Sequence, residues 1–221
     1  MLFLLTGGVQ TGKTRWLEQL LAELADDGVE SQGVVAPGVW RRRDDEEASE
    51  DRPFGSGQGE YEKLGIDNVL LPGGERLPFA RRRDLAKQEG TFDPASQSAA
   101  AQLVWEISDD AIARVNAHFD ALGSRSYRRE FSPALLVVDE LGRLELEHGR
   151  GLTSALDLIG CGATACFPHA IVVVRAWLRD RAEERFAGAW GGAIAIEPGN
   201  VARDAVRAAF GLAPFIDNWY H

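Results

Sequence analysis

Short hydrophobic runs recur along the chain, and stretches with helical periodicity separate them. Runs of this kind indicate strands that are buried on both faces, as in a parallel sheet. After the first run, hydrophobic residues fall three and four positions apart, as at Leu17, Leu20 and Leu24, which is typical of a helix packed against a sheet. The predicted strands are Leu2–Thr6, Gly33–Trp40, Ala134–Asp139, Ala170–Arg175 and Gly192–Pro198.

Predicted helices occupy the segments between these strands. Ser108 or Asp109 can cap the helix Asp109–Leu122, because short polar side chains accept hydrogen bonds from the first free amides of a helix. The other predicted helices begin near Lys13, follow the loop at Gly149–Gly151, and cover Trp177–Phe186 and Val201–Phe210. Strands that alternate with helices favour an α/β fold with a doubly wound, mostly parallel sheet and helices on both faces.

The segment from about residue 41 to 98 departs from this alternation. It begins with a polar, acidic and Gly-rich stretch, so we expect an irregular acidic insertion within a single domain that covers residues 1–221. Asn68–Leu71 and Arg76–Ala80 are short strand candidates around the turn "PGG". Ala99–Ser108 mixes helix and strand signals, and no element is assigned there.

The charge of the chain bears on which partners it can have. The formal net charge is −10 at pH 7, which argues against non-specific nucleic-acid binding because the phosphate backbone requires a basic footprint. Much of the acid lies in Asp44–Asp51, and arginines cluster at Arg41–Arg43 and Arg81–Arg83. We expect these runs to be solvated surface, with the arginines pairing with the acidic run.

Composition also limits the class of protein. Hydrophobic residues make up 45% of the 221 residues, enough for a sizeable core, but no apolar stretch approaches the ~18 residues of a membrane span. Cys161 and Cys166 form no CxxC pair, and the four histidines show no zinc-like spacing. We expect a cytoplasmic monomer that does not bind membranes.

The stretch "GGVQTGKT" lies between the first predicted strand and the first predicted helix. It matches G-x-x-x-x-G-K-[ST], a loop whose backbone amides and following helix N-terminus hold phosphates. In such a loop Lys13 reaches the β- and γ-phosphates, and the Thr14 hydroxyl ligates Mg²⁺. The predicted nucleotide-binding residues here are Gly7, Gly8, Val9, Gln10, Thr11, Gly12, Lys13 and Thr14.

A second motif, "LLVVDELGRLEL", contains the clearest predicted strand and ends it with two adjacent carboxylates. An acid at the tip of such a strand holds Mg²⁺ in P-loop proteins, so Asp139 is the predicted second metal ligand beside Thr14. Glu140 is the predicted catalytic residue, together with Lys13, because a carboxylate at this position can orient or deprotonate a water molecule. The alternative for Glu140 is a helix-capping or solvated carboxylate.

These two motifs together resemble the THEP1-type nucleoside-triphosphatase family. "LLTGGVQTGKTRWLEQLLAELADDGVESQGVVAPGVW" is similar to its opening, and "AIVVVRAWLRDRAEERF" and "AIAIEPGNVARDAV" are similar to its last strands and helices. The resemblance implies a P-loop NTPase fold that hydrolyses nucleoside 5′-triphosphates to diphosphates with Mg²⁺ and broad base tolerance. The sequence departs from the family pattern at the acidic run Asp44–Asp51 and at "ARRRDLAKQEGTFDPASQ".

The resemblance further implies that the nucleotide contacts the end of the second motif as well as the loop. The residues concerned are Val137, Val138, Asp139, Glu140, Leu141 and Gly142.

Arginines and tryptophans supply further candidates. A cation helps a γ-phosphate transition state, and Arg15, Arg143, Arg175 and Arg179 are candidates for this role. The first choice is an arginine after the strand that ends near residue 175, at the edge where ligands of open α/β folds gather. Trp40 and Trp105 can stack a base, although partly buried packing is the commoner use of tryptophan.

The leading functional hypothesis is a Mg²⁺-dependent nucleoside-triphosphatase. One alternative is a nucleotide or small-molecule kinase on the same fold, for which only residues 41–83 are long enough to form a substrate lid. Another is a nucleotide-gated binding module that assists a partner, for instance in metallocofactor assembly. The sequence contains neither a clear lid motif nor a metal-ligand cluster, which favours the hydrolase.

Overall fold

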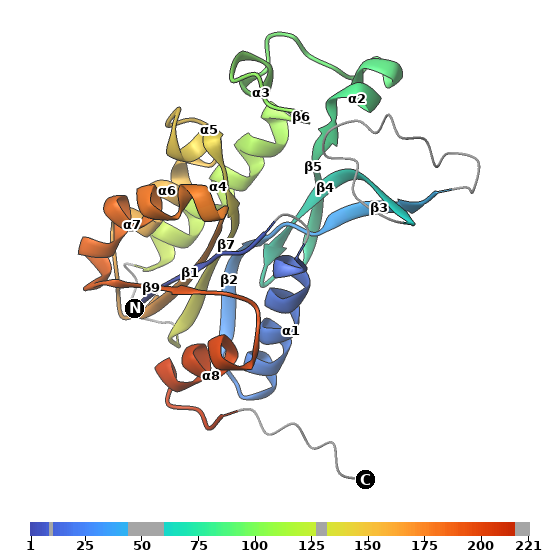
Figure 1. Cartoon of the computed structure of the whole chain (residues 1–221). Helices are drawn as coiled ribbons and strands as arrows, with labels where there is room; N and C mark the ends of the chain where they lie inside the picture. Colours follow the sequence, from blue (N-terminus) through green and yellow to red (C-terminus); the bar gives the residue numbers. More distant parts are fainter. Residues whose placement is uncertain (9–10, 44–59, 127–131, 215–221) are drawn as a thin grey trace.

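The computed structural model describes residues 1–8, 11–43, 60–126 and 132–214. They form a twisted sheet with helices packed on it (Figure 1). The strands are β1 (Leu2–Leu5), β2 (Glu30–Val35), β3 (Gly38–Arg42), β4 (Tyr61–Leu71), β5 (Glu75–Arg82), β6 (Trp105–Ile107), β7 (Ala134–Leu141), β8 (His169–Val174) and β9 (Ala193–Ile196). The helices are α1 (Lys13–Asp26), α2 (Arg83–Glu89), α3 (Gln97–Ala100), α4 (Asp109–Ser126), α5 (Arg143–Leu146), α6 (Thr153–Gly160), η2 (Ala176–Leu178), α7 (Arg179–Phe186), η3 (Ala187–Trp190) and α8 (Asn200–Ala209).

Across the described residues the sheet has nine strands. The strands of one half run parallel to one another, and those of the other half run antiparallel. The parallel half runs in the order β2-β7-β8-β1-β9. The antiparallel half is β3–β6: the end of β4 pairs with β2, its beginning pairs with β3, and β5 and β6 follow on its other side. The predicted α/β class is confirmed, and the sheet is mixed because a four-stranded antiparallel half extends the parallel one.

Helices cover both faces of the parallel half, as predicted. Successive residues of β1 point to opposite faces, so Leu2 and Leu4 belong to one core while Phe3 and Leu5 belong to the other. The first core is closed by α4, α6 and α7, and the second by α1 and α8 (Figure 1). All four residues of β1 have no exposed surface, which explains why its sequence is a continuous hydrophobic run.

Most predicted element boundaries in the parallel half agree with the structure. Pro37 separates β2 from β3, as its lack of a backbone N–H leads one to expect. Ser108 caps α4, since its hydroxyl accepts a hydrogen bond of 3.2 Å from the amide of Ala111. The predicted helix at Trp177–Phe186 starts as the 3-10 turn η2 before α7, and the short helix α5 was not predicted.

The prediction of an irregular segment over residues 41–98 is wrong for the residues that the structure describes there. Tyr61–Leu71 is an eleven-residue strand, of which the predicted Asn68–Leu71 is only the end. Two helices, α2 and α3, follow β5, and Ala99–Ser108 contains the edge strand β6. The acidic run Asp44–Asp51 lies outside the described residues.

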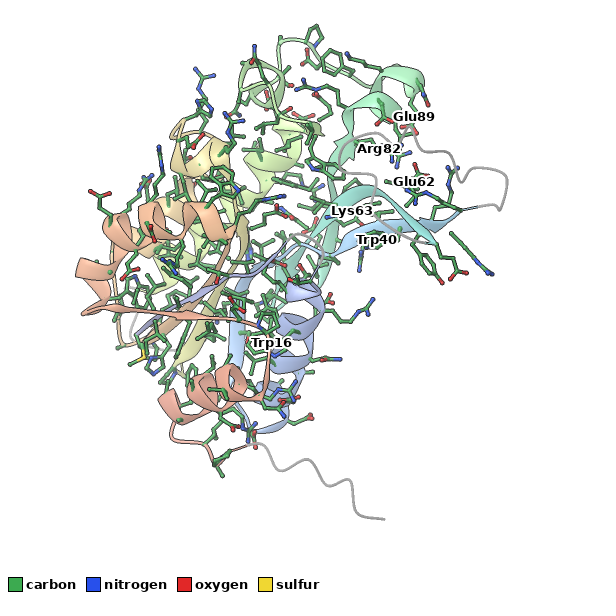
Figure 2. The ribbon with its side chains drawn as sticks, viewed as in Figure 1. Trp16, Trp40, Glu62, Lys63, Arg82 and Glu89 are labelled. Carbon is green, nitrogen blue, oxygen red and sulfur yellow. The ribbon has the colours of Figure 1, made fainter. Side chains whose placement is uncertain are left out.

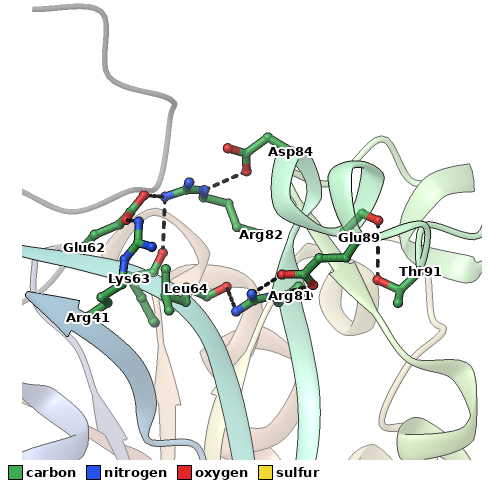
Figure 3. Close-up of polar contacts among 10 residues, drawn as sticks. Arg41, Glu62, Lys63, Leu64, Arg81, Arg82, Asp84, Glu89 and Thr91 are labelled. Carbon is green, nitrogen blue, oxygen red and sulfur yellow. Dashed lines mark hydrogen bonds and ion pairs between the residues drawn. The ribbon is translucent and has the colours of Figure 1, made fainter. Parts of the chain in front are cut away.

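Ion pairs between neighbouring strands hold the antiparallel half together. Arg82 donates to Glu62 at 2.6 Å and to Asp84 at 2.6 Å, and Arg41 donates to the other oxygen of Glu62 at 2.7 Å (Figure 3). Arg81 pairs with Glu89 from α2. Within the described residues, these arginines therefore pair with carboxylates of their own sheet and of α2, whereas the predicted partner was the acidic run.

A membrane span is not found in the described part of the chain. No helix there is long and apolar enough to cross a bilayer.

Candidate functional site

The motif "GGVQTGKT" forms the turn from β1 into α1. Gly12 has a left-handed backbone, with φ of 79°, and is the residue before the first turn of α1. Its carbonyl accepts a hydrogen bond of 2.9 Å from the amide of Trp16, which starts the helix. The strand–loop–helix context required for a phosphate loop is therefore present. The predicted residues Val9 and Gln10 lie outside the described residues.

Lys13 folds back over this loop. Its ammonium donates to the carbonyls of Gly8 at 2.7 Å and Gly7 at 3.2 Å. Burial lowers the pKa of Lys13, and the neighbouring charges of Glu140 and Asp139 oppose that shift while Arg175 adds to it. The loop lysine thus shares one electrostatic environment with the second motif, although more than 120 residues separate them in sequence.

Asp139 lies at the end of β7 and is almost completely buried. One carboxylate oxygen accepts a 2.9 Å hydrogen bond from the amide of Ala36, and the nearby Thr14 hydroxyl acts to lower the pKa of the carboxyl group. Burial raises the pKa of Asp139 to about 6, and the charge of Glu140 adds to this effect. A nearby dication would favour the ionised carboxylate again.

The Thr14–Asp139 pair fits the chemistry of Mg²⁺. Magnesium is commonly held by one or two protein oxygens and completes its shell with waters and substrate phosphates. The structure brings two such oxygen donors close together at the phosphate loop. No cluster of three or more His, Cys, Asp or Glu side chains with metal-binding geometry occurs among the described residues, so phosphates or waters must complete any coordination shell here.

Glu140 adopts a strained backbone conformation. Its φ is 69°, a left-handed value that is uncommon for residues other than glycine, and the pairing of β7 with β8 shifts register between Val138 and Leu141. Bulges of this kind redirect side chains next to functional sites. The carboxylate accepts a 2.8 Å hydrogen bond from Arg175, the first residue after β8.

The environment of Glu140 keeps it ionised. Burial acts to raise its pKa, but the positive charges of Arg175 and Lys63 outweigh burial and lower it. The Glu140 side chain is 33% exposed to solvent, so a water molecule can reach it. The alternative role as a helix cap belongs to another residue, because Glu145 is the carboxylate that caps α5, accepting from the amide of Gly142 at 2.9 Å.

Three predicted nucleotide contacts are wrong as the structure stands. Val137, Val138 and Leu141 have no exposed surface; Val137 belongs to the core beneath α1, and the other two belong to the core beneath α4. Residues so enclosed cannot contact a ligand. Gly142 is partly exposed, but its amide is already bound by Glu145.

Of the four arginine candidates, Arg175 reaches the site. The other three point elsewhere: Arg143 pairs with Glu147 at 2.9 Å, Arg179 pairs with Asp180 at 2.8 Å, and Arg15 is exposed on α1. The sequence favoured an arginine from the range Arg175–Arg185. In the structure Arg175 is at the site because β8 lies between β1 and β7 and its carboxyl end meets theirs.

Sequence reasoning missed Lys63, which belongs to β4 in the antiparallel half. Its ammonium lies over the rings of Trp40 and Trp105, and the charge of Glu140 is the largest charge effect on its pKa. Figure 2 shows Lys63 beside Trp40. One signal was available, since the sequence has only three lysines among its 24 basic residues. No local pattern, however, indicates that residue 63 approaches residue 140.

Comparisons with known proteins give little further information. The chain is 32% identical over 141 residues to the polyketide synthase GfsB of Streptomyces halstedii. The match covers 60% of this chain and spans about 2% of the length of that protein. No protein-family model matches the chain. No solved structure matches it either.

Proposed function

We propose that this protein has a P-loop NTPase fold and is a Mg²⁺-dependent nucleoside-triphosphatase. One observation carries the proposal: the carboxyl ends of β1, β8 and β7, which are adjacent strands, bring together the phosphate-loop motif, Arg175 and the Asp139–Glu140 pair. A phosphate cradle, a cation, a metal ligand and a carboxylate for water are the parts that phosphoanhydride hydrolysis requires. The resemblance of both motifs to the THEP1-type family supports the same reaction.

In this proposal the loop amides and Lys13 bind the β- and γ-phosphates. To do so, the Lys13 ammonium leaves the carbonyls of Gly7 and Gly8 for phosphate oxygens, which are stronger acceptors because they are charged. Thr14 and Asp139 would hold Mg²⁺, which would supply positive charge against the negative charge that develops on the phosphate oxygens. Ala36 fixes the direction of the Asp139 carboxylate.

Glu140 orients the attacking water in this scheme. Because nearby cations lower its pKa, the carboxylate is a weak proton acceptor and a good hydrogen-bond acceptor, so positioning is its main contribution. Arg175 holds the carboxylate at 2.8 Å and lies close enough to the site to stabilise charge on the transferred phosphoryl group. The product is the nucleoside diphosphate and phosphate.

Phosphate release by the purified protein with Mg²⁺ and ATP, GTP, CTP or UTP tests this proposal. We expect turnover with several bases, because no base-reading residue belongs to the scheme, and we expect Lys13→Ala to abolish it. Lys87→Ala, a lysine on α2, is the matched control and should retain turnover. Release that requires an added acceptor or a protein partner would instead support a kinase or a nucleotide-gated module.

A further inference from the structure

The ammonium of Lys63 lies over two aromatic rings, one from the adjacent strand β3 and one from β6, two strands away in the sheet. Lys63 pairs with Trp40 across the β3–β4 ladder, and its ammonium lies 5.9 Å from the centroid of that ring. On the other side, the same nitrogen lies 5.3 Å from the ring centroid of Trp105 on β6. Both distances fall within the range of cation–π attraction, so the rings help to position the ammonium.

Gly38 allows this group to pack closely. A Cβ at position 38 would lie 2.6 Å from Nε1 of Trp40 and 2.9 Å from Cε of Lys63. Both distances are shorter than real Cβ contacts, and both involve the distal atoms of side chains that can move. Any larger residue at position 38 would therefore displace the tryptophan and the lysine.

The ammonium of Lys63 lacks an anionic partner. Arg41, Arg81 and Arg82 of the same half each pair with a carboxylate. By contrast, no described residue forms a hydrogen bond or an ion pair with the Lys63 ammonium, which leaves its three N–H donors available. Its charge interactions are with Glu140, Asp139 and Arg175, the same groups that surround Lys13.

The charges at the site are suited to an anion. Lys13, Lys63 and Arg175 are three cations around two carboxylates, Asp139 and Glu140. The backbone places Lys63 near these carboxylates: Lys63 Cε packs against Gly38, and Ala36, two residues before Gly38, donates a 2.9 Å hydrogen bond to Asp139.

We propose that Lys63, positioned by Trp40 and Trp105, binds the γ-phosphate of the nucleotide. This inference rests on the proposed nucleotide site. Lys63 thereby distinguishes triphosphates from diphosphates, because its contact exists only when a γ-phosphate is present. Its charge also stabilises the transferred phosphoryl group.

The test compares the binding of two nucleotides in Mg²⁺: the non-hydrolysable triphosphate adenylyl imidodiphosphate, and ADP. A charge-assisted hydrogen bond accounts for about tenfold to hundredfold in affinity. We therefore expect Lys63→Gln to raise the Kd of the triphosphate by about that factor and to leave the Kd of ADP within about twofold. Lys87→Gln is the matched control, because Lys87 also lies over an aromatic ring, at 5.1 Å from Phe92, but belongs to α2 and not to the proposed site.

Gly38→Ala provides a second variant, which keeps the positive charge of Lys63 but shifts its position. We expect it to fold, because the added methyl group displaces side-chain ends only, and to lose part of the same preference for the triphosphate. Thermal unfolding of both variants checks that the fold is intact.

The outcomes separate this inference from the proposed hydrolysis. Equal loss of triphosphate and ADP affinity in Lys63→Gln would overturn the assignment to the γ-phosphate, as would unchanged affinity for both. A protein that binds neither nucleotide would overturn both proposals. A protein that prefers the triphosphate through Lys63 but releases no phosphate would contradict the hydrolase and support the Lys63 assignment.

Discussion

The two halves of the sheet are stabilised in different ways. In the parallel half, β1 and the first five residues of β7 are buried hydrophobic residues that pack into two cores. In the antiparallel half, buried positions include the charged residues Glu62 and Arg82. The parallel half is therefore stabilised by apolar burial, whereas the antiparallel half adds buried charges to its apolar residues, and each of these charges depends on its partner.

The candidate site lies where these halves meet. The phosphate loop, Arg175 and Glu140 come from the ends of parallel strands, while Lys63 comes from β4. Ala36, in the short link between β2 and β3, binds Asp139 and so joins the halves at the predicted metal ligand. The parallel half supplies the phosphate-loop motif, Arg175 and the two carboxylates, and the antiparallel half supplies Lys63.

The largest effect is expected at Gly33 on β2, where the two halves are joined. Its φ is 127°, and an added Cβ would overlap the carbonyl of Val137 on β7. Gly33→Ala should therefore lower the free energy of unfolding by about 3 kcal/mol. Urea denaturation measures this loss, and Gly73→Ala, where a Cβ meets nothing within 4 Å, is the control expected to change it by less than about 0.5 kcal/mol. Equal effects at both positions would contradict a rigid junction.

A smaller loss in the free energy of unfolding is expected from Arg82→Met. This change leaves Glu62 buried but still paired with Arg41, so the free energy of unfolding should fall by about 2 kcal/mol, less than for a fully orphaned buried charge. The same denaturation experiment measures it. Arg76→Met breaks an exposed pair with Asp67 and should cost less than about 1 kcal/mol. If Arg82→Met costs no more than Arg76→Met, buried charge pairs do not stabilise the antiparallel half.

A pH dependence should follow from Glu62. Burial acts to raise its pKa, but hydrogen bonds from Arg82 and Arg41 outweigh burial and lower the pKa below its usual value of 4.5. The ionised group therefore contributes stability that is present above pH 4.5 and is lost as the pH falls through the lowered value. Glu62→Gln should flatten this acid-side loss in melting temperature. An unchanged profile would show that other carboxylates cause it.

Much of the parallel half could be predicted because its signals are local. A strand buried on both faces, such as β1 or β7, is a continuous hydrophobic run whatever its partners are. The first half of β4, "YEKLGI", has no such signal, because Glu62 is stabilised by Arg82, twenty positions further along. A local pattern cannot show that partner, and the strand was therefore missed.

The residues of the candidate site also divide into those with a local sequence signal and those whose place depends on tertiary packing. Gly7–Thr14 and Asp139-Glu140 have motifs of their own, and Arg175 follows a recognisable strand. Val137 and Val138 were assigned to the nucleotide through the resemblance, but adjacent strand residues point to opposite cores and are enclosed by them. The place of Lys63 depends on how β4 packs beside β3, which is a tertiary property.

The most direct test of the account measures phosphate release and ATP binding together in Glu140→Gln. Glutamine retains the size of the side chain but accepts hydrogen bonds from water more weakly and carries no charge. We expect turnover to fall by about 10²-fold or more while ATP binding persists. Turnover equal to that of the unmodified protein, with binding intact, would contradict the central claim that Glu140 directs water at the γ-phosphate.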